Sequence, residues 1–390
     1  MELSEFRQSN LLYTQESLSK YQPGGYHPVS LGDTFKDERY EIHHKLGWGG
    51  FSTVWLANDK DHNQWVALKI MTAASSQSRE LQILKHLEGC SQGELSSNYL
   101  AQLIDDFIHE GPNGVHKCLV FELLGPPVDK VLQDYREFGD KLDSEIVLRM
   151  STQLLKAIKF IHSAGICHGD ISGRNIAFTC TRLWNLTKEE LLVTLGSPKY
   201  EPLTRIDGAP LENGLPSQLV KAADWTEWID EDEEDIRLFD FGESFFHGHE
   251  PDKLAQPGPL RVPETIFTDS FDYRVDLWRA GSVIYSFVFT AWPFSYMGGD
   301  EFLAFQMIDF VEKLPAEWEP KWKSMVMNSK KDLRLEDNGA FEIEENFAKL
   351  TPDPILQSLL PVIQGLLRFL PSSRLTIEDA LDMLDNIQES

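Results

Sequence analysis

The chain has 390 residues, of which 42% are apolar and 25% are charged, which is the ordinary composition of a globular protein. It carries 36 basic and 62 acidic residues, so its formal net charge is −26. This charge argues against nucleic acid or an anionic membrane as the main partner, because both are polyanions, and it would favour cationic partners. The length suits a two-lobed enzyme with a large core.

The cysteines and the apolar stretches indicate the compartment. The four cysteines show no metal-like spacing and fit free thiols in a reducing environment. The N-terminus lacks a basic segment followed by an apolar core, so we expect no signal peptide. The longest mainly apolar stretch, 280–294, is shorter than the roughly 20 residues that span a bilayer. These features predict a cytoplasmic or nuclear protein, with a monomer as the default expectation.

The first third of the chain predicts a polar extension and then a strand-rich lobe. Residues 1–38 are polar and turn-rich, and residues 39–124 form short β-branched or aromatic runs between turns. One helix with apolar residues at helical spacing, 81–87, interrupts them. The expected strands are Tyr40–Leu46, Thr53–Asn58 and Trp65–Ile70.

From Gly125 onward the pattern is helical. Apolar residues between Ile146 and Ile161 follow the i, i+3, i+4, i+7 spacing, and Gly165 ends that helix. Residues 179–236 break the pattern and end in an acidic run, so we expect an insert there; helical patterns resume at 276–290. The fold class predicted is α+β, with a β-rich lobe at 39–124 and a mainly α-helical lobe at 125–390.

A glycine-rich turn between two predicted strands is a candidate phosphate loop. Glycine also serves ordinary hairpins, so the turn alone is weak evidence. A strand Lys soon follows it, in the sequence Trp65-Val66-Ala67-Leu68-Lys69, which matches the strand that presents a Lys to the α- and β-phosphates of ATP. The candidate loop contacts are Leu46, Gly47, Gly49, Gly50, Ser52 and Val54.

Three further positions complete the predicted nucleotide site. Ala67 is small enough to admit a purine, and Glu80 at the start of the helix would hold Lys69 by an ion pair. Glu80 could instead be an exposed residue that complements the helix dipole. The backbone of Glu122 and Leu124, at the end of a predicted strand, could hydrogen-bond an adenine edge, although an ordinary strand end has the same sequence.

The second set of motifs carries phosphoryl-transfer chemistry. His168-Gly169-Asp170 is followed by Asn175 five positions after the Asp, and 64 residues separate Asn175 from Asp240-Phe241-Gly242. This is the spacing of a kinase catalytic loop and of the D-F-G that anchors magnesium. Asp170 would orient the acceptor hydroxyl, while Asn175 and Asp240 would hold Mg²⁺. Further on, we expect Glu264 and Arg374 to form a buried ion pair.

The residues from Tyr21 onward resemble a eukaryotic protein kinase, and most of all the SR-protein kinase family and its fungal relatives. Tyr21–Val29 resembles the leader Y-x-x-G-G-Y-H-P-V of that family, and Leu46–Leu56 is similar to its glycine loop L-G-W-G-x-F-S-T-V-W-L. The resemblance implies ATP and Mg²⁺ as cofactors, basic or Arg/Ser-rich protein substrates, and an insertion before the D-F-G.

The chain departs from the kinase pattern at several positions. Ser172 replaces the usual Lys, and we propose Arg174 as the cation that neutralises the transferred phosphoryl group. Gly169 replaces the Arg that grips an activation-loop phosphate, and only Ser244 offers a hydroxyl between Gly242 and Glu264. We therefore expect activity without activation-loop phosphorylation.

Two alternatives remain open. One is a pseudokinase scaffold that binds nucleotide without transferring phosphate, which Ser172 permits although Lys69, Asp170, Asn175 and Asp240 are retained. The other is a small-molecule kinase of the aminoglycoside or choline type, which His168-Gly169-Asp170 would suit. The motifs together favour a serine/threonine protein kinase.

Overall fold

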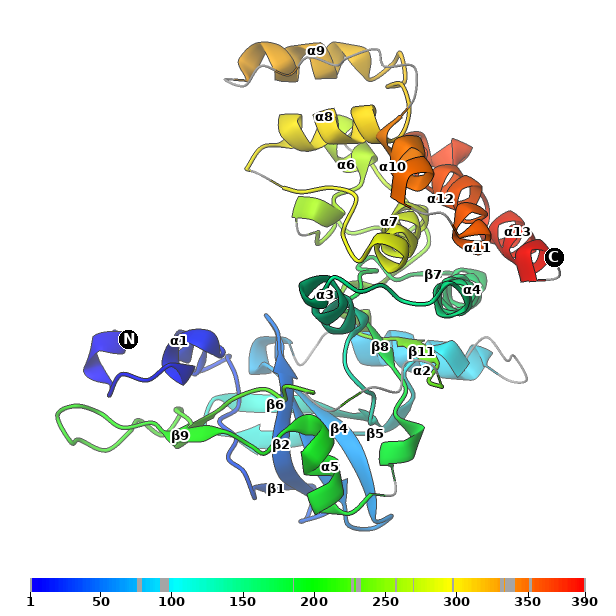
Figure 1. Ribbon diagram of the computed structural model, residues 1–390. Coiled ribbons are helices and arrows are strands. Elements are labelled where there is room, and N and C mark those ends of the chain that lie inside the picture. Colours follow the sequence, from blue (N-terminus) through cyan, green and yellow to red (C-terminus); the bar gives the residue numbers. More distant parts are fainter. Residues whose placement is uncertain are drawn as a thin grey trace. The chain divides into compact units, whose positions relative to one another are not determined.

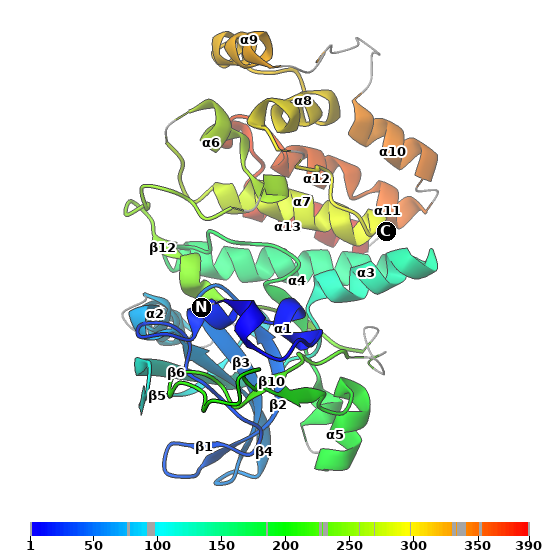
Figure 2. The same cartoon turned by 90° about the vertical axis from the view of Figure 1, so that its left-hand side faces the viewer.

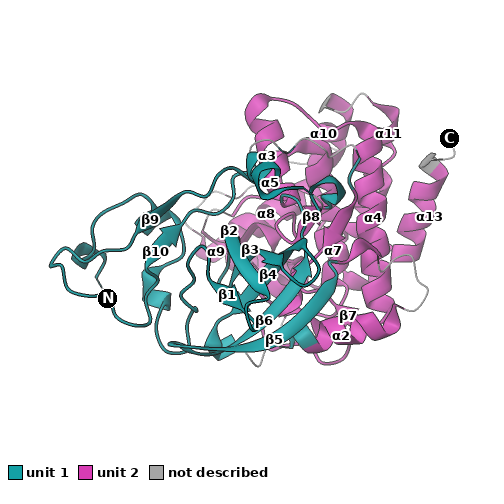
Figure 3. Cartoon of the chain, turned by 90° about the horizontal axis from the view of Figure 1, so that it is seen from below, with its two compact units in different colours: residues 1–81, 101–126, 179–234 teal, residues 82–100, 127–178, 235–390 magenta. Residues whose placement is uncertain are grey.

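A computed structural model describes most of the chain (Figure 1). Its contacts divide the chain into two compact units, which Figure 3 colours separately. Unit 1 comprises Met1–Leu81, Ala101–Pro126 and Thr179–Glu234, and unit 2 comprises Gln82–Leu100, Pro127–Phe178 and Asp235–Ser390. The described residues are 2–75, 79–91, 98–184, 186–225, 228, 233–256, 258–268, 270–296, 298–329, 333, 341–350 and 353–388.

Unit 1 is built on an antiparallel six-stranded sheet with the order β1-β2-β3-β4-β6-β5. The three strands predicted from the β-branched runs are present as β2, β3 and β4, and the predicted helix is α2, which begins in unit 1. The bounds are β1 Thr34–Phe35, β2 Tyr40–Trp48, β3 Ser52–Asp59, β4 Gln64–Met71, η3 Ala73–Ser75, α2 Glu80–Cys90, β5 Leu103–Gly111 and β6 Gly114–Glu122.

The two faces of this sheet differ because side chains alternate along a strand. One face carries a buried apolar core that includes Tyr40, Trp55, Leu68 and Val120. The other face carries Val54 and Lys69, which lie opposite each other in the register of β3 and β4, and Ala67, two residues before Lys69. The pleat therefore places the predicted nucleotide residues on one face and the core on the other.

The N-terminal extension and the expected insert share a second core within unit 1. Phe6, Leu11 and Tyr26 of the extension pack with Leu203 and Leu219 of the insert, and Figure 2 shows α1 beside β10. An isolated bridge also joins Phe6 to Arg205. The elements are η1 Leu3–Glu5, α1 Leu11–Thr14, η2 Leu18–Lys20, η5 Thr181–Leu183, α5 Lys188–Leu195, β9 Tyr200–Pro202 and β10 Gln218–Val220.

Unit 2 is mainly helical. The helix predicted from the apolar spacing is α4, Ser144–Ser163, and the helical pattern predicted at 276–290 is α7, Val275–Phe289; the two pack together. Nearly every residue of α7 is buried. The other helices are α3 Val128–Phe138, η6 Phe241–Glu243, η7 Gly258–Leu260, α6 Pro263–Phe267, α8 Asp300–Phe310, α9 Glu319–Asn328, α10 Glu342–Leu350, α11 Pro354–Gln357, α12 Leu360–Leu366, η8 Pro371–Ser373 and α13 Ile377–Gln388.

Two short antiparallel strand pairs support the predicted catalytic residues of unit 2. The strands are β7 Ile166–Cys167, β8 Ile176–Phe178, β11 Ile236–Leu238 and β12 Phe245–Phe246, with β7 paired to β12 and β8 to β11. Among the described residues, no helix has the length and apolarity needed to cross a bilayer.

Candidate active site

The glycine-rich turn lies at the end of the β2–β3 hairpin, where the N–H of Gly49 donates to the Ser52 carbonyl at 2.9 Å. A Cβ built on Gly47, Gly49 or Gly50 meets no atom within 4 Å, and none of the three has a positive φ. The fold itself therefore does not require glycine at these positions. Because these residues have no side chain, a ligand can approach the backbone closely, as a phosphate loop must allow.

The nucleotide face of the sheet brings several predicted residues together. Val54, Ala67 and Leu46 are half-buried apolar residues among otherwise buried strand neighbours. On the same face, Lys69 Nζ donates to Glu80 Oε1 at 2.6 Å, and both side chains are buried. The predicted pairing of Lys69 with Glu80 is thus present, and the alternative of an exposed Glu80 is wrong.

The strand end predicted to bind adenine is the end of β6. The Glu122 carboxylate accepts from the N–H of Gln102 at 3.0 Å, so this side chain fixes the strand end. The Leu123 carbonyl accepts hydrogen bonds from Cys180 Sγ and Trp184 Nε1 of the insert. Among the described residues, none hydrogen-bonds to the backbone of Leu124, which leaves that peptide group for a ligand.

The N-terminal extension holds the glycine loop directly, which the sequence analysis did not foresee. The Tyr26 hydroxyl donates to the Gly49 carbonyl, and Lys20 Nζ donates to the Gly50 carbonyl at 3.0 Å. Burial raises the pKa of Tyr26 to about 12, so its phenol keeps the proton that it donates. Tyr26 belongs to the leader string Tyr21–Val29. That string was the feature of the sequence that could have indicated a role for Tyr26.

A buried ion pair anchors this part of the extension to the strand that enters the loop. Lys45 of β2 pairs with Glu16, and Glu16 Oε1 accepts from the Tyr21 hydroxyl at 2.6 Å. The insert joins the same point, since the Ala223 N–H donates to the Lys45 carbonyl at 2.8 Å. Extension and insert therefore fix one end of the glycine loop together.

The catalytic loop lies between β7 and β8 of unit 2. Asn175 Nδ2 donates both to the Asp170 carbonyl at 2.7 Å and to Asp170 Oδ2 at 2.8 Å. Asp170 remains partly exposed, with 27% of its side chain accessible. Burial raises the pKa of Asp170, and Arg279 opposes that rise. The carboxylate is thus oriented by fixed donors and open on one side, as a group that receives a substrate hydroxyl must be.

Helix α7 holds the backbone of this loop. The buried Asp276 carboxylate accepts from the N–H groups of His168 and Gly169 at 2.8 and 3.0 Å, and from His162 Nε2 at 3.0 Å. His168 Nδ1 accepts from the Asp170 N–H at 3.2 Å. These hydrogen bonds hold the backbone of the loop at residues 168–170 in a single conformation.

Arg279 is a site residue that the sequence analysis missed. It is fully buried in α7, donates to the carbonyls of Gly169 and Ala255, and lies 3.3 Å from Asp170 Oδ1. Gly169 has φ +75°, and a Cβ there would lie 2.7 Å from the Glu243 carbonyl oxygen, so a side chain at 169 would require a backbone shift. The guanidinium beside Asp170, the predicted catalytic residue, therefore comes from α7. The feature of the sequence that could have indicated Arg279 is a single Arg within the most apolar predicted helix.

The β8–β11 pair closes the long gap between Asn175 and Asp240. Ile176 lies opposite Leu238, and the Phe239 N–H donates to the Asn175 carbonyl at 2.9 Å, so the two predicted metal ligands follow adjacent strand ends. Burial raises the pKa of Glu243, as do the charges of Asp170 and Asp240. Asn175 uses its amide nitrogen on Asp170, and its amide oxygen with the nearby carboxylates is the oxygen set that Mg²⁺ prefers.

Arg174 is an exposed residue that pairs with α3. Its Nε lies 3.5 Å from Asp129 Oδ2 of α3, and 81% of its side chain is exposed. Ser172 is buried. The structure therefore brings Arg279 to Asp170 and pairs Arg174 with Asp129.

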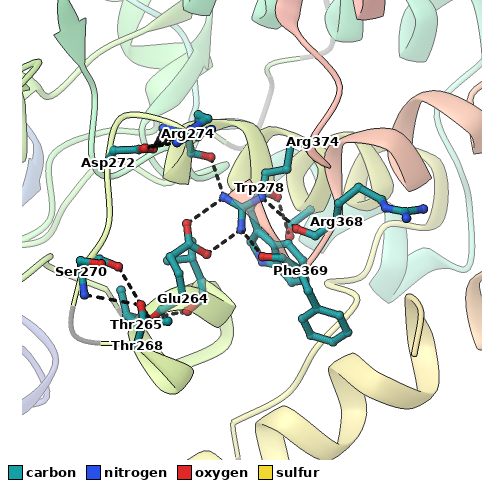
Figure 4. A network of polar contacts seen from close by, with 12 residues as sticks. Glu264, Thr265, Thr268, Ser270, Asp272, Arg274, Trp278, Arg368, Phe369 and Arg374 are labelled. Atoms are coloured by element: carbon teal, nitrogen blue, oxygen red, sulfur yellow. Dashed lines mark hydrogen bonds and ion pairs between the residues drawn. The ribbon is translucent and has the colours of Figure 1, made fainter. Parts of the chain in front are cut away.

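The predicted ion pair between Glu264 and Arg374 is confirmed (Figure 4). Arg374 donates to both Glu264 oxygens, at 2.8 and 2.5 Å, and to the carbonyls of Arg274, Arg368 and Phe369. Its guanidinium also lies over the Trp278 ring, 5.4 Å from the ring centre. This network ties α6 to α7 and to the chain before α13.

Unit 1 carries a buried lysine–glutamate pair on the sheet that bears the glycine turn, and unit 2 carries Asp170, Asn175 and Asp240; each set matches the motifs of a protein kinase. Residues 40–186 match the protein kinase domain family. A crystal structure of a kinase domain is similar with a TM-score of 0.62 at 19% identity, covering 91% of this chain and 97% of that chain. The chain therefore carries a protein kinase domain with the protein kinase fold, and the predicted fold class is confirmed.

Proteins similar to this chain are named as serine/threonine-protein kinases, and they include SRPK of Physarum polycephalum and SRSF protein kinase 3 of Homo sapiens. The serine/threonine-protein kinase SKY1 of Saccharomyces cerevisiae is 40% identical over 170 residues, 42% of this chain and 23% of that protein. The serine/threonine-protein kinase SRPK of Physarum polycephalum is 28% identical over 408 residues, 94% of this chain and 90% of that protein. The chain thus spans less than a quarter of the yeast relative and most of the slime-mould relative, and the resemblance to this family is confirmed.

Proposed function

We propose that this protein is an ATP-dependent serine/threonine protein kinase that transfers the γ-phosphate to Ser in basic or Arg/Ser-rich proteins. The main support for this proposal is the Asp170 carboxylate. Asn175 donates to one of its oxygens and Arg279 lies beside the other, while part of the carboxylate stays exposed. The names of the relatives and the charge of −26 support the substrate class.

In the proposed reaction, Asp170 accepts the hydrogen bond of the substrate hydroxyl and directs its oxygen at the γ-phosphorus. Lys69, fixed by Glu80, binds the α- and β-phosphates, and the glycine loop covers them with backbone N–H groups. Asn175 and Asp240 would hold Mg²⁺, which when bound neutralises charge on the phosphates. Leu124 would bind the adenine edge through its backbone, beside Glu122.

We further propose that activity requires no activation-loop phosphorylation. Ser244 is buried, and its hydroxyl donates to the His168 carbonyl at 2.9 Å, so it is not presented to another kinase. No other Ser, Thr or Tyr lies between Gly242 and Glu264. The basic residue that a loop phosphate would engage is replaced by Gly169, and Arg279 already occupies the neighbourhood of Asp170.

The test is a phosphorylation assay with purified protein, Mg-ATP and an Arg/Ser repeat peptide, with Asp170→Asn as the control. We expect transfer to Ser that the control loses by several orders of magnitude, and no change after phosphatase treatment. Nucleotide binding without transfer would instead identify a pseudokinase. Turnover of aminoglycoside or choline acceptors, but of no peptide, would identify a small-molecule kinase.

A further inference from the structure

Unit 2 contains a pocket of about 420 Å³ beside the catalytic loop. It is formed by α3 along most of its length, by Arg174 of the catalytic loop and by the end of α7 with the residues that follow. The charged lining residues are Asp129, Lys130, Arg136 and Arg174.

The charge of this pocket is positive. Three of the four charged lining residues are cations, and the single carboxylate, Asp129, already pairs with Arg174 at 3.5 Å. Lys130 pairs with Asp134, outside the lining, while Arg136 forms no ion pair with any described residue and acts on Asp129 only through its charge. A pocket with an excess of cations stands out in a chain whose net charge is −26.

The pocket is fixed relative to the catalytic loop. The N–H of Asp129 donates to the Gly173 carbonyl at 3.0 Å, and a Cβ on Gly173 would collide with the Asp129 carboxylate. This close approach fixes the start of α3 against the loop that carries Asp170 and Arg174. A peptide whose Ser reaches Asp170 would therefore offer its side chain at one particular neighbouring position to the pocket.

We propose that this pocket binds an anionic side chain of the acceptor protein, either the carboxylate of Asp or Glu or the phosphate of a phosphoserine. Guanidinium groups form strong, charge-assisted hydrogen bonds with both anions. An arginine of the acceptor would instead meet two arginines, a lysine and a carboxylate that is already paired. The proposal rests on the proposed kinase function and adds a sequence requirement to it: an anion at one fixed distance from the acceptor Ser.

The experiment scans a Ser-containing peptide with Ala, Arg, Glu and phosphoserine at each of the four positions on either side of the acceptor. We expect one position at which Glu or phosphoserine lowers KM at least about tenfold relative to Ala, a ratio that corresponds to ~1.4 kcal/mol. Comparison of the Glu and phosphoserine arms decides which anion the pocket prefers. The gain should shrink as salt is raised, because the cations are exposed.

Arg136→Glu tests the pocket itself, because Arg136 lies on α3 outside the catalytic loop. We expect this variant to lose the preference for an anion, to gain one for Arg at the same position, and to keep its kcat on the Ala peptide. Lys323→Glu on α9 makes the same charge change at an exposed site and should alter nothing. An equal KM for Ala, Glu and phosphoserine peptides at every position would overturn the proposal.

A binding measurement separates this proposal from the proposed function. Calorimetry with the phosphoserine and Glu peptides needs no turnover, and should give weaker binding to Arg136→Glu than to the native protein. Equal affinity in both would overturn the anion site even if the kinase is active. Anion-dependent binding without phosphate transfer would retain the site and reject the kinase.

Discussion

Removal of the Arg374 side chain should destabilise the helical unit by about 4 kcal/mol. Arg374→Ala leaves the Glu264 carboxylate, of which only 2% is exposed, without its two charged hydrogen bonds. It also removes the donor from three backbone carbonyls and the cation above Trp278. Breaking a buried pair on one side costs roughly 3–5 kcal/mol, because the remaining charge stays buried.

Urea unfolding followed by tryptophan fluorescence measures this loss, since α7 carries Trp278 near the network. Arg368→Ala is the matched control, because its side chain is 46% exposed and pairs with Glu312, and an exposed pair contributes ~0–1 kcal/mol. The backbone carbonyl of residue 368, which Arg374 uses, is retained in that control. Combining Glu264→Gln with Arg374→Met should cost less than the sum of the two single changes. An unfolding free energy for Arg374→Ala within ~1 kcal/mol of the native value would refute the reasoning.

Three further outcomes can be measured. Tyr26→Phe removes one hydrogen bond from the glycine loop and should raise KM for ATP about 2- to 10-fold, whereas Tyr13→Phe, at an exposed site, should not. Arg279→Met should lower kcat with little change in KM for ATP, and Arg279→Lys should restore part of it; an unchanged kcat contradicts its positioning of Asp170. Burial, helped by two neighbouring histidines, lowers the pKa of His27 to about 3. Below about pH 6.5 the unfolded chain binds a proton that the folded chain does not, so unfolding free energy should fall by roughly 1.4 kcal/mol per pH unit from pH 6 to 4. His27→Gln should flatten that slope, and an equally steep slope in the variant would contradict it.

The parts of the fold that follow from local pattern were predictable from the sequence. Strands β2, β3 and β4 and helices α4 and α7 have apolar residues at the spacing of their secondary structure, and each lies within a few residues of the predicted range. The Lys69–Glu80 and Glu264–Arg374 pairs were also predictable, because motif strings fix which residue types must meet.

Contacts that depend on packing between distant segments were not predictable. Nothing local to α7 indicates that Arg279 reaches the carbonyl of Gly169, because this depends on how the helix lies against the loop. The orientation of Arg174 toward Asp129 is of the same kind, since it depends on where α3 begins. The Tyr26–Gly49 bond needs the extension to fold back over the hairpin, and neither sequence segment shows that.

The core that the N-terminal extension shares with the insert links two segments that are almost two hundred positions apart in the chain. A fragment that begins at Arg39 would keep Leu203 and Leu219 but lose Phe6, Leu11 and Tyr26, which cover them. It would expose the apolar surface that these residues bury, and the glycine loop would lose its hydrogen bonds from Tyr26 and Lys20. Shortened forms of this kinase should therefore avoid newly exposed apolar surface only when both segments are trimmed together, and deletions in one segment should be accompanied by changes in the other.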